Sequence, residues 1–287
     1  MSPTTAEVNI QYRPMLESDF PAAHALSQAV HWRHRPEDWQ LLHRLGGGFV
    51  AQCDGSVIGT ALWWPHGDDH ASLGMVIVSP QSQGRGVGRE LMNRLLEAIG
   101  ERNTLLHATP AGQPLYERLG FEVIGKIHQH QGIVASRVPV APPPGTRLRA
   151  AEAGDAAKLA ELASRAAGMS RTQVVSELLR IAEGVVIADD NGNPVGFGIL
   201  RSFGQGDIIG PVVAPDAEHA RALLSHLAAT RTGSFVRIDM SDEHGLDALL
   251  SELGLAHVDT PIAMVRGEAP KVDPGIHQFA IASQAFF

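Results

Sequence analysis

The chain repeats itself once, and this repeat limits the folds that the sequence can adopt. The segment at residues 12–27, YRPMLESDFPAAHALS, recurs as LRAAEAGDAAKLAELA at residues 148–163, and the segment at 47–62 resembles the one at 183–200. Matching segments follow one another in the same order at an offset of roughly 136 residues. We therefore interpret the chain as two copies of one structural unit.

The segments within each copy indicate the class of fold. Arg13 aligns with Arg149 and Asp19 with Asp155, and each pair of residues lies in the pattern of a short strand, a capped turn and an amphipathic helix. Antiparallel strands, a turn into a helix, another strand, a short helix and a last strand follow in each copy. This order predicts an α/β or α+β domain in which helices flank a mixed sheet.

Prolines mark the predicted boundary between the two copies. Four of them lie within VPVAPPPGTRLR, residues 138–149, and such a segment favours a stiff, extended connector. We therefore expect a first domain at residues 1–138, a linker at 139–146 and a second domain at 147–287. The apolar segment GIHQFAIASQAFF at the end of the sequence is expected to dock as a last helix or strand.

Composition narrows the class of function. The sequence has 287 residues and a formal net charge of -8, which argues against binding to nucleic acid or to an anionic membrane, because both attract clusters of Lys and Arg. The single cysteine, Cys53, excludes internal disulfides and fits a reducing compartment. No apolar run has the length of a membrane span and the N-terminus lacks a secretory pattern, so we expect a cytoplasmic protein with a small-molecule substrate.

The stretch SPQSQGRGVGRELMNRLL, residues 79–96, has the pattern of an anion-binding site. Gly84, Gly86 and Gly88 lie between the apolar run LGMVIV and a helix whose apolar residues recur every four positions. Backbone N–H groups point outwards at the start of a helix, where the helix dipole favours negative charge. The stretch lacks the lysine of a Walker motif, and its glycine spacing does not fit the dinucleotide fingerprint.

The pattern Gln83-x-x-Gly86-x-Gly88 resembles the pyrophosphate-binding motif of the GNAT acetyltransferase superfamily, whose members bind acetyl-CoA. The later stretch PLYERLGFEV, residues 114–123, looks like the Tyr-x-x-x-Gly-Phe ending of the same family. The resemblance covers residues 8–138. It implies two GNAT-like domains in tandem, each with a mixed, mostly antiparallel sheet flanked by helices.

This resemblance implies roles for individual residues. Backbone N–H groups of the glycine loop would hold the CoA pyrophosphate, a backbone N–H near Val76 would stabilise the oxyanion, and Tyr116 would protonate the departing CoA thiolate. The structural alternatives are a tight packing turn for the glycines and a packed, hydrogen-bonded aromatic for Tyr116. The residues expected to contact the cofactor are Val76, Val78, Gln83, Gly84, Arg85, Gly86, Val87, Gly88 and Arg89.

The position of the general base departs from the family pattern. Many relatives carry a Glu eleven positions before the motif glutamine, but Ser72 occupies that position here. His70, two residues earlier, is the candidate base, because an imidazole can take a proton near neutral pH. An exposed loop histidine with no catalytic role, or a chain of water molecules in place of a dedicated base, are the alternatives.

The acceptor site is expected in two segments, AVHWRHRPEDW (29–39) and WWPHGDDH (63–70), which hold all four tryptophans. Aromatic walls with acidic or imidazole groups suit a small amine, although such residues are also common in cores. Four positions are the candidates for the acceptor site. Positions 32 and 33, within the stretch His31-Trp32-Arg33, are assigned as a His–Trp pair, and the other two are Trp64 and Asp69. We expect no metal, since His128 and His130 alternate on a predicted strand without a further ligand.

The second copy has lost the features of the glycine loop. Residues 211–227, PVVAPDAEHARALLSHL, contain no glycine, and the loop is three residues shorter. Asp216 and Glu218 would repel a pyrophosphate, and Leu250 stands in the position of Tyr116. We therefore expect a degenerate copy, which either packs against the first copy to close the acceptor pocket or binds a ligand of its own.

The resemblance implies an acetyl-CoA-dependent N-acetyltransferase that acts on a primary amine of a small molecule. The alternative function is a non-catalytic acyl-CoA or metabolite sensor on the same fold. The expected partners are the amine and acetyl-CoA, in a monomer or a homodimer.

Overall fold

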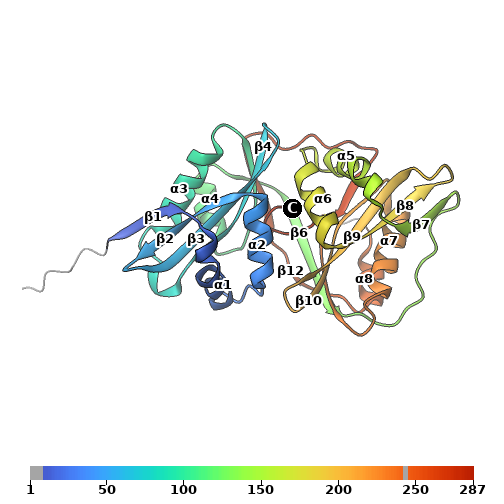
Figure 1. Cartoon of the computed structure of the whole chain (residues 1–287), viewed down its shortest axis with the longest axis horizontal. Coiled ribbons are helices and arrows are strands. Elements are labelled where there is room, and N and C mark those ends of the chain that lie inside the picture. Colours follow the sequence, from blue (N-terminus) through green and yellow to red (C-terminus); the bar gives the residue numbers. More distant parts are fainter. Residues whose placement is uncertain (1–8, 242–244) are drawn as a thin grey trace, which may run out of the picture. The chain divides into compact units, whose positions relative to one another are not determined.

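The first repeat folds in the order that its sequence predicts. The computed structural model describes residues 9–241 and 245–287. The elements of the first repeat, most of which are labelled in Figure 1, are β1 (Ile10–Pro14), α1 (Phe20–Ala29), α2 (Pro36–Leu45), β2 (Gly47–Cys53), β3 (Ser56–His66), β4 (His70–Val78), α3 (Val87–Ile99), β5 (Asn103–Ala108), α4 (Gln113–Arg118) and β6 (Glu122–Ile133).

The second repeat has the same order of elements, followed by additional strands. Its elements are β7 (Thr146–Ala150), α5 (Ala156–Ala167), α6 (Thr172–Ile181), β8 (Glu183–Asp189), β9 (Pro194–Phe203), β10 (Gly206–Ala214), α7 (Ala217–Ala229), β11 (Phe235–Ser241), α8 (Asp247–Glu252), β12 (Ala256–Asp259), β13 (Ile262–Arg266) and β14 (His277–Ala280). No helix of the described residues is both long and apolar enough to cross a membrane.

An ion pair at the start of each repeat confirms the alignment of the two copies. Arg13 holds Asp19 through two hydrogen bonds of 2.7 and 2.8 Å, and Arg149 holds Asp155 through two of 2.6 and 2.8 Å. Each aspartate also accepts a 2.8 Å hydrogen bond from the backbone N–H three residues earlier, which closes the turn before the helix. The arginine lowers the pKa of the aspartate in both copies.

The chain forms two compact units whose boundaries differ from those of the repeats. Unit 1 consists of residues 1–64 and 73–100, and unit 2 consists of residues 65–72 and 101–287. The predicted linker therefore lies inside unit 2, where residues 134–143 are neither helix nor strand. The domain boundaries derived from the repeat stay a prediction, because packing divides this chain elsewhere.

Unit 1 contains a sheet in the order β1-β2-β3-β4, in which β1, β2 and β3 are antiparallel neighbours. Helix α3 packs on this sheet at Gly59, where a Cβ atom would lie 3.1 Å from the side chain of Leu91. The predicted apolar stripe of α3 is buried, and Arg89 on the opposite side is exposed.

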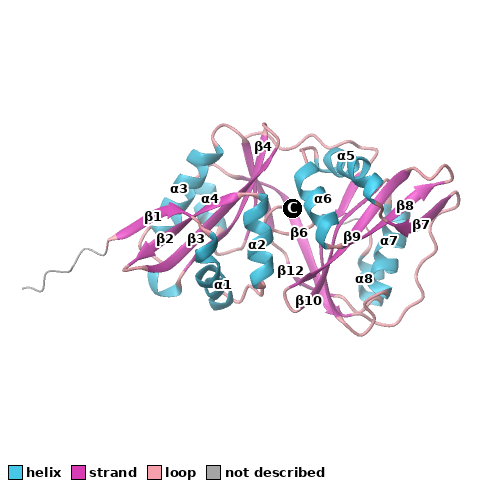
Figure 2. Cartoon of the chain, viewed as in Figure 1, coloured by secondary structure: helices cyan, strands magenta, loops and turns pink. Residues whose placement is uncertain are grey.

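Strand exchange between the repeats explains why unit 2 begins inside the first repeat. Its strands have the order β5-β13-β6-β11-β14-β10-β9-β8-β7, and β12 also pairs with β6. Strand β13 of the second repeat lies between β5 and β6 of the first, antiparallel to both. The parallel pairs are β10 with β11 and the first residues of β4 with β5, so the predicted fold class, a mixed and mostly antiparallel sheet with helices beside it, is confirmed (Figure 2).

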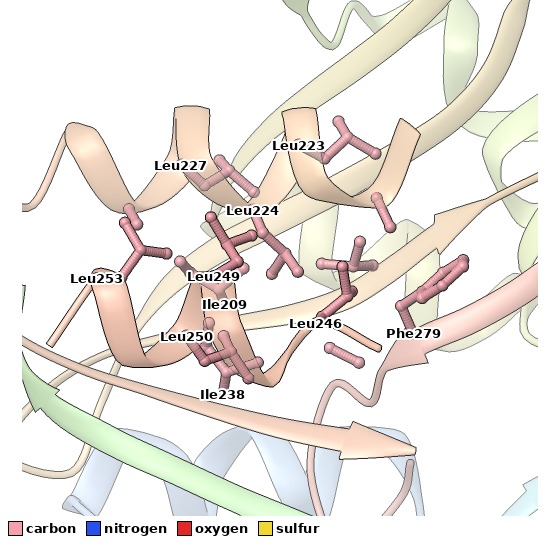
Figure 3. Packing of buried hydrophobic residues seen from close by; sticks show 14 of the residues in the cluster. Ile209, Leu223, Leu224, Leu227, Ile238, Leu246, Leu249, Leu250, Leu253 and Phe279 are labelled. Atoms are coloured by element: carbon pink, nitrogen blue, oxygen red, sulfur yellow. The ribbon is translucent and has the colours of Figure 1, made fainter. Parts of the chain in front are cut away.

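The core of the second repeat packs α7 and α8 on the strands of unit 2. Figure 3 shows leucines of both helices facing β10, β11 and β14. The labelled residues are Ile209, Leu223, Leu224, Leu227, Ile238, Leu246, Leu249, Leu250, Leu253 and Phe279. The apolar C-terminal segment supplies β14, and the prediction that it docks as a strand is confirmed.

Candidate functional site

The glycine loop between β4 and α3 has the backbone conformation that only glycine adopts easily. Gly84 has φ +73° and Gly86 has φ +80°, both in the left-handed region. A Cβ atom at either position would meet nothing within 4 Å. Packing therefore does not require glycine at these positions, and the backbone of the loop lies beside open space.

The start of α3 presents backbone donors and positive charge. The hydrogen bond from Glu90 N–H to Gly86 C=O, 3.1 Å long, is the first of the helical ladder, so the three preceding amides have no acceptor within the helix. Gln83 turns back and donates 3.2 Å to the C=O of Val78. Arg85 and Arg89 are exposed at the same helix start. Together these groups can hold an anion with two or more charges.

A strained residue distorts β4 before the glycine loop. Met75 has φ +52° although its side chain is buried, and its C=O accepts a 2.8 Å hydrogen bond from the hydroxyl of Thr60. A left-handed residue inside a strand re-aims the neighbouring amides, and such strain is concentrated at functional sites. Val76 and Val78, which follow it, are both half-buried. This distortion occurs where the sequence predicts an oxyanion donor.

Tyr116 lies on α4 in unit 2, where a glycine-terminated turn fixes its position. Gly120 has φ +84°, and Phe121 N–H donates 3.1 Å to the C=O of Tyr116, which is the Schellman pattern at the end of a helix. The two rings meet edge to face, with centroids 6.0 Å apart. The side chain is 8% exposed, and burial raises the pKa of its phenol to about 12. Among the described residues its hydroxyl has no hydrogen-bond partner, so it is a donor available to a ligand.

Ser72, which occupies the position where many relatives carry a glutamate, is buried in unit 2. Ser72 lies on β4 and its hydroxyl is 2.9 Å from Nε2 of His66, which is also buried. His70, the candidate base, is half-buried at the start of the same strand. Burial and the Arg171 guanidinium hold the pKa of His66 well below its ordinary value. The described contacts do not join His70 to Tyr116.

The structure removes Trp64 from the candidates for the acceptor site. Its side chain is 0% exposed, and its indole N–H donates 2.8 Å to the C=O of Leu42. Trp64 is therefore a core residue and cannot line a pocket. Asp69, in contrast, is exposed and stays a candidate.

The His–Trp pair of the acceptor prediction also needs a correction. The pair lies one position earlier than 32 and 33, at His31 and Trp32, and position 33 holds Arg33. Arg33 is exposed, and its guanidinium would repel a protonated amine, so it does not supply the aromatic wall that was expected there. His31 is exposed with φ +61° and Trp32 is half-buried, and these two residues stay candidates.

In the second repeat, the helix that corresponds to α3 carries its own anion. The Asp216 carboxylate caps α7 and accepts 3.0 Å hydrogen bonds from the N–H groups of Glu218 and His219. The His219 ring lies 2.7 Å from the same oxygen. The donors that the first repeat leaves open are therefore occupied by a side chain in the second.

The space between the diverging strands of the second repeat is also occupied. Strands β10 and β11 pair in parallel at only two positions, and β14 then pairs with both strands. The backbone N–H of Ile281 continues this contact by donating 2.9 Å to the C=O of Asp239. In the first repeat the recorded pairing of β4 with β5 ends at Ser72 and Leu105.

Three residues of unit 2 were not singled out by the sequence. His107 on β5 places Nδ1 3.0 Å from the C=O of Gln284, and its ring lies 4.1 Å from that of Phe287. His66 and Arg171 form a second buried group. Neither group has a local sequence signature, because its members lie more than 100 residues apart. Among the described residues no cluster of three or more His, Cys, Asp or Glu side chains can hold a metal ion.

The fold and the glycine loop define an acetyltransferase of the GNAT class. Two family models for a GNAT acetyltransferase domain match the chain, one at residues 45–123 and the other at 159–279. The chain therefore belongs to the GNAT acetyltransferases and contains two such domains in tandem.

Individual relatives agree with this assignment. The chain is 28% identical over 217 residues to the uncharacterized N-acetyltransferase YitH of Bacillus subtilis, a match that covers 75% of this chain and 76% of the relative. Its fold is similar to that of a protein of Pyrococcus horikoshii provisionally assigned as an acetyltransferase, with TM-score 0.79, 18% identity, and coverage of 100% and 99% of the two chains. It is also similar to a tandem GNAT protein from the clavulanic acid biosynthesis pathway, with TM-score 0.67, 17% identity, and coverage of 92% and 100%.

Proposed function

We propose that the chain is an acetyl-CoA-dependent N-acetyltransferase that acts on a primary amine of a small molecule. The contrast between the two equivalent helix starts carries this proposal. Helix α3 begins at an open loop with two left-handed glycines and exposed arginines, whereas α7 begins at a carboxylate that occupies the same donors. The fold does not require the glycines, so a ligand is the better explanation for them.

The residues of the first repeat fit the groups of acetyl-CoA. Acetyl-CoA supplies the acetyl thioester that the amine attacks. The amides of the loop from Gln83 to Arg89 would hold the pyrophosphate, with charge supplied by Arg85 and Arg89. The Val76 N–H, which follows the strained Met75, would stabilise the oxyanion.

Proton movement in the proposed reaction needs two groups. The amine arrives protonated and must lose a proton, either to His70 or to water, before it attacks. Tyr116 would offer its hydroxyl, which has no partner among the described residues, to the departing sulfur. Two contacts of the second repeat, Arg171 with His66 and Ser170 with Gly67, lie in residues 65–72. They support the proposal that the second repeat closes the acceptor pocket.

A non-catalytic sensor of acyl-CoA is the second candidate function. The loss of a carboxylate at Ser72 favours it, because a sensor needs no base. The Tyr116 hydroxyl, which no described residue holds, favours an enzyme, because a sensor has no leaving group to stabilise.

Two measurements test the proposal in sequence. The melting temperature of the protein should rise with acetyl-CoA, and the absence of a shift at saturating acetyl-CoA would exclude both candidate functions. A panel of primary amines is then assayed for release of free CoA thiol. Release with at least one amine identifies an enzyme, whereas binding without release from any acceptor identifies a sensor.

A further inference from the structure

Arg171 is a buried cation for which the described residues supply no counter-charge. It lies in the second repeat just before α6 and is only 3% exposed. Its Nη1 atom donates 2.8 Å to the C=O of Phe286 and lies 3.3 Å from Nδ1 of His66. No carboxylate of the described residues lies within ion-pair distance of it. Burial lowers the pKa of its guanidinium to about 9, which still leaves it charged at neutral pH.

His66 cannot neutralise this charge, but it fixes the position of the guanidinium. Nη1 of Arg171 lies 3.3 Å from Nδ1 and 3.5 Å from Nε2 of His66, and Nε2 lies 2.9 Å from the Ser72 hydroxyl. Because Arg171 has only donors, a ring nitrogen of His66 must accept from it. The imidazole is therefore neutral and connects Arg171 to Ser72. This chain of contacts holds Arg171 against the strand that would carry the base in related proteins.

The edge of the Arg171 guanidinium formed by Nε and Nη2 makes no hydrogen bond with the described residues. Nε and Nη2 together carry three N–H groups, and none of them donates to a described residue. The residue as a whole keeps 3% of its surface exposed. Two parallel N–H groups in this planar arrangement match the two oxygens of a carboxylate.

The surroundings of Arg171 belong to the segment predicted to hold the acceptor. Residues 65–72, which overlap the predicted acceptor segment 63–70, comprise the end of β3, the turn after it and the start of β4, and they contain the candidates Asp69 and His70. At Gly67 in this segment, a Cβ atom would lie 3.4 Å from the Cβ of Ser170, the neighbour of Arg171. Arg171 is therefore a residue of the second repeat placed at the acceptor segment of the first.

We propose that Arg171 binds a carboxylate of the acceptor, so that the substrate is an amine that also carries a carboxylate group, such as an amino acid. This inference rests on the proposed N-acetyltransferase function. It assigns the second repeat a direct role in substrate selection. A buried, uncompensated charge is costly, and a substrate carboxylate would compensate it on binding.

The test compares matched pairs of amines that differ only in the carboxylate. L-amino acids and ω-amino acids are assayed beside the corresponding decarboxylated amines, with CoA thiol release as the readout. We expect kcat/KM to favour the carboxylate-bearing member at least 10-fold. Equal or better turnover of the decarboxylated amines would overturn the proposal.

Variants of Arg171 and Arg180, two arginines at helix α6, test whether the preference for carboxylate-bearing amines depends on Arg171. Arg171→Gln should raise KM for the carboxylate-bearing amines at least 10-fold and remove the preference, with the melting shift by acetyl-CoA retained. Arg180→Gln is the matched control, because Arg180 is exposed. Arg171→Lys keeps the charge without the fork and should lose most of the preference, so it serves if the glutamine variant does not fold. Retention of the preference in both Arg171 variants would overturn the proposal.

A binding measurement separates this proposal from the proposed function. The same amine pairs are titrated into the protein with CoA present, and the melting temperature is recorded without turnover. A larger shift with the carboxylate-bearing member that is lost in Arg171→Gln supports the proposal even where no amine is acetylated. No difference between the members of the pairs counts against Arg171 alone, whatever the outcome of the acetyl-CoA titration.

Discussion

At the scale of single residues, Gly86 and Gly55 form a matched pair that separates ligand binding from backbone strain. Both have φ +80° and open space beside them, but Gly55 lies in the turn between β2 and β3. Replacing either with Glu should cost about 1 kcal/mol of stability, because a side chain strains the left-handed backbone.

Only Gly86→Glu should affect acetyl-CoA binding, because its carboxylate would meet the pyrophosphate at the loop. At 100 times the dissociation constant, acetyl-CoA should stabilise the wild type and Gly55→Glu by about 2.7 kcal/mol. Thermal melting with and without acetyl-CoA measures this. An undiminished shift in Gly86→Glu would rule out the loop as the binding site.

Tyr116 is expected to act as a hydrogen-bond donor to the leaving sulfur. With its pKa raised to about 12, complete transfer of its proton to a thiolate of pKa about 8.5 would be uphill by roughly 5 kcal/mol. Tyr116→Phe should lower kcat about 10- to 100-fold with little change in the affinity for acetyl-CoA. Tyr12→Phe, which alters the other tyrosine of the chain, should leave kcat unchanged.

The raised pKa of Tyr116 also predicts the alkaline limb of the rate profile. The phenol stays protonated up to pH 10 and beyond, so kcat should not fall between pH 8 and 10 through ionisation of Tyr116. Initial rates at saturating substrates measure this. A fall with a midpoint near 10 that disappears in Tyr116→Phe would contradict the burial of its hydroxyl.

Some features at this scale have no signal in the sequence. Met75 adopts a left-handed conformation that methionine does not favour, so no pattern predicts it. Trp64 belongs to a segment rich in aromatic and polar residues, but an aromatic side chain in a core has the same local pattern as one in a pocket. Arg171 becomes conspicuous only when its burial and its missing carboxylate are known.

At the scale of elements, α3 and α7 show how one helix start is used for binding and its copy for stability. Asp216 supplies the cap of α7, so Asp216→Ala should lower the free energy of unfolding by about 1–2 kcal/mol. Glu218→Ala in the same turn should cost less, since its side chain caps no amide. Urea denaturation compares them, and an equal loss in both variants would contradict the capping role.

The elements themselves could be predicted because their signals are local. The Arg13–Asp19 turn, the glycine loop and the glycine-terminated helix at Gly120 each depend on residues within a few positions of one another. The repeat supplies a second copy of the first and third of these signals, at Arg149–Asp155 and at Gly254. Helix and strand order was therefore accessible from the sequence, and so was the loss of the loop in the second copy.

At the scale of the whole molecule, His107 connects β5 to the C-terminal segment, and burial lowers its pKa to about 4. The unfolded chain takes up a proton at this residue below about pH 6.5, but the folded chain does so only near pH 4. Stability present above pH 6.5 should therefore be lost as the pH falls, by about 2 kcal/mol between pH 7.5 and 5 from this residue. His66 contributes in the same direction.

Urea denaturation at the two pH values tests this with one asparagine variant. His107→Asn keeps a donor toward Gln284 but cannot titrate, so the loss of stability at pH 5 should shrink by about 2 kcal/mol. The same pH dependence in His107→Asn and wild type would contradict this role for His107.

The pairing of distant strands could not be predicted from the sequence. Strand β13 inserts between β5 and β6, more than 100 residues earlier in the chain, and β14 inserts between β10 and β11. Strand patterns indicate which face is buried but not which strand is the neighbour. The repeat therefore identifies the copies correctly, whereas the compact units follow from this exchange of strands.

Strand β14 would compete with any ligand that binds between β10 and β11 of the second repeat. Only residues 267–276 separate it from β13, so it is tethered beside β10 and β11 at an effective concentration on the order of millimolar. A free molecule would have to exceed this local concentration or bind correspondingly more tightly than a strand already paired on both sides. Restoring the glycines before α7 would therefore not by itself restore a binding site, because an intramolecular competitor is built into the chain.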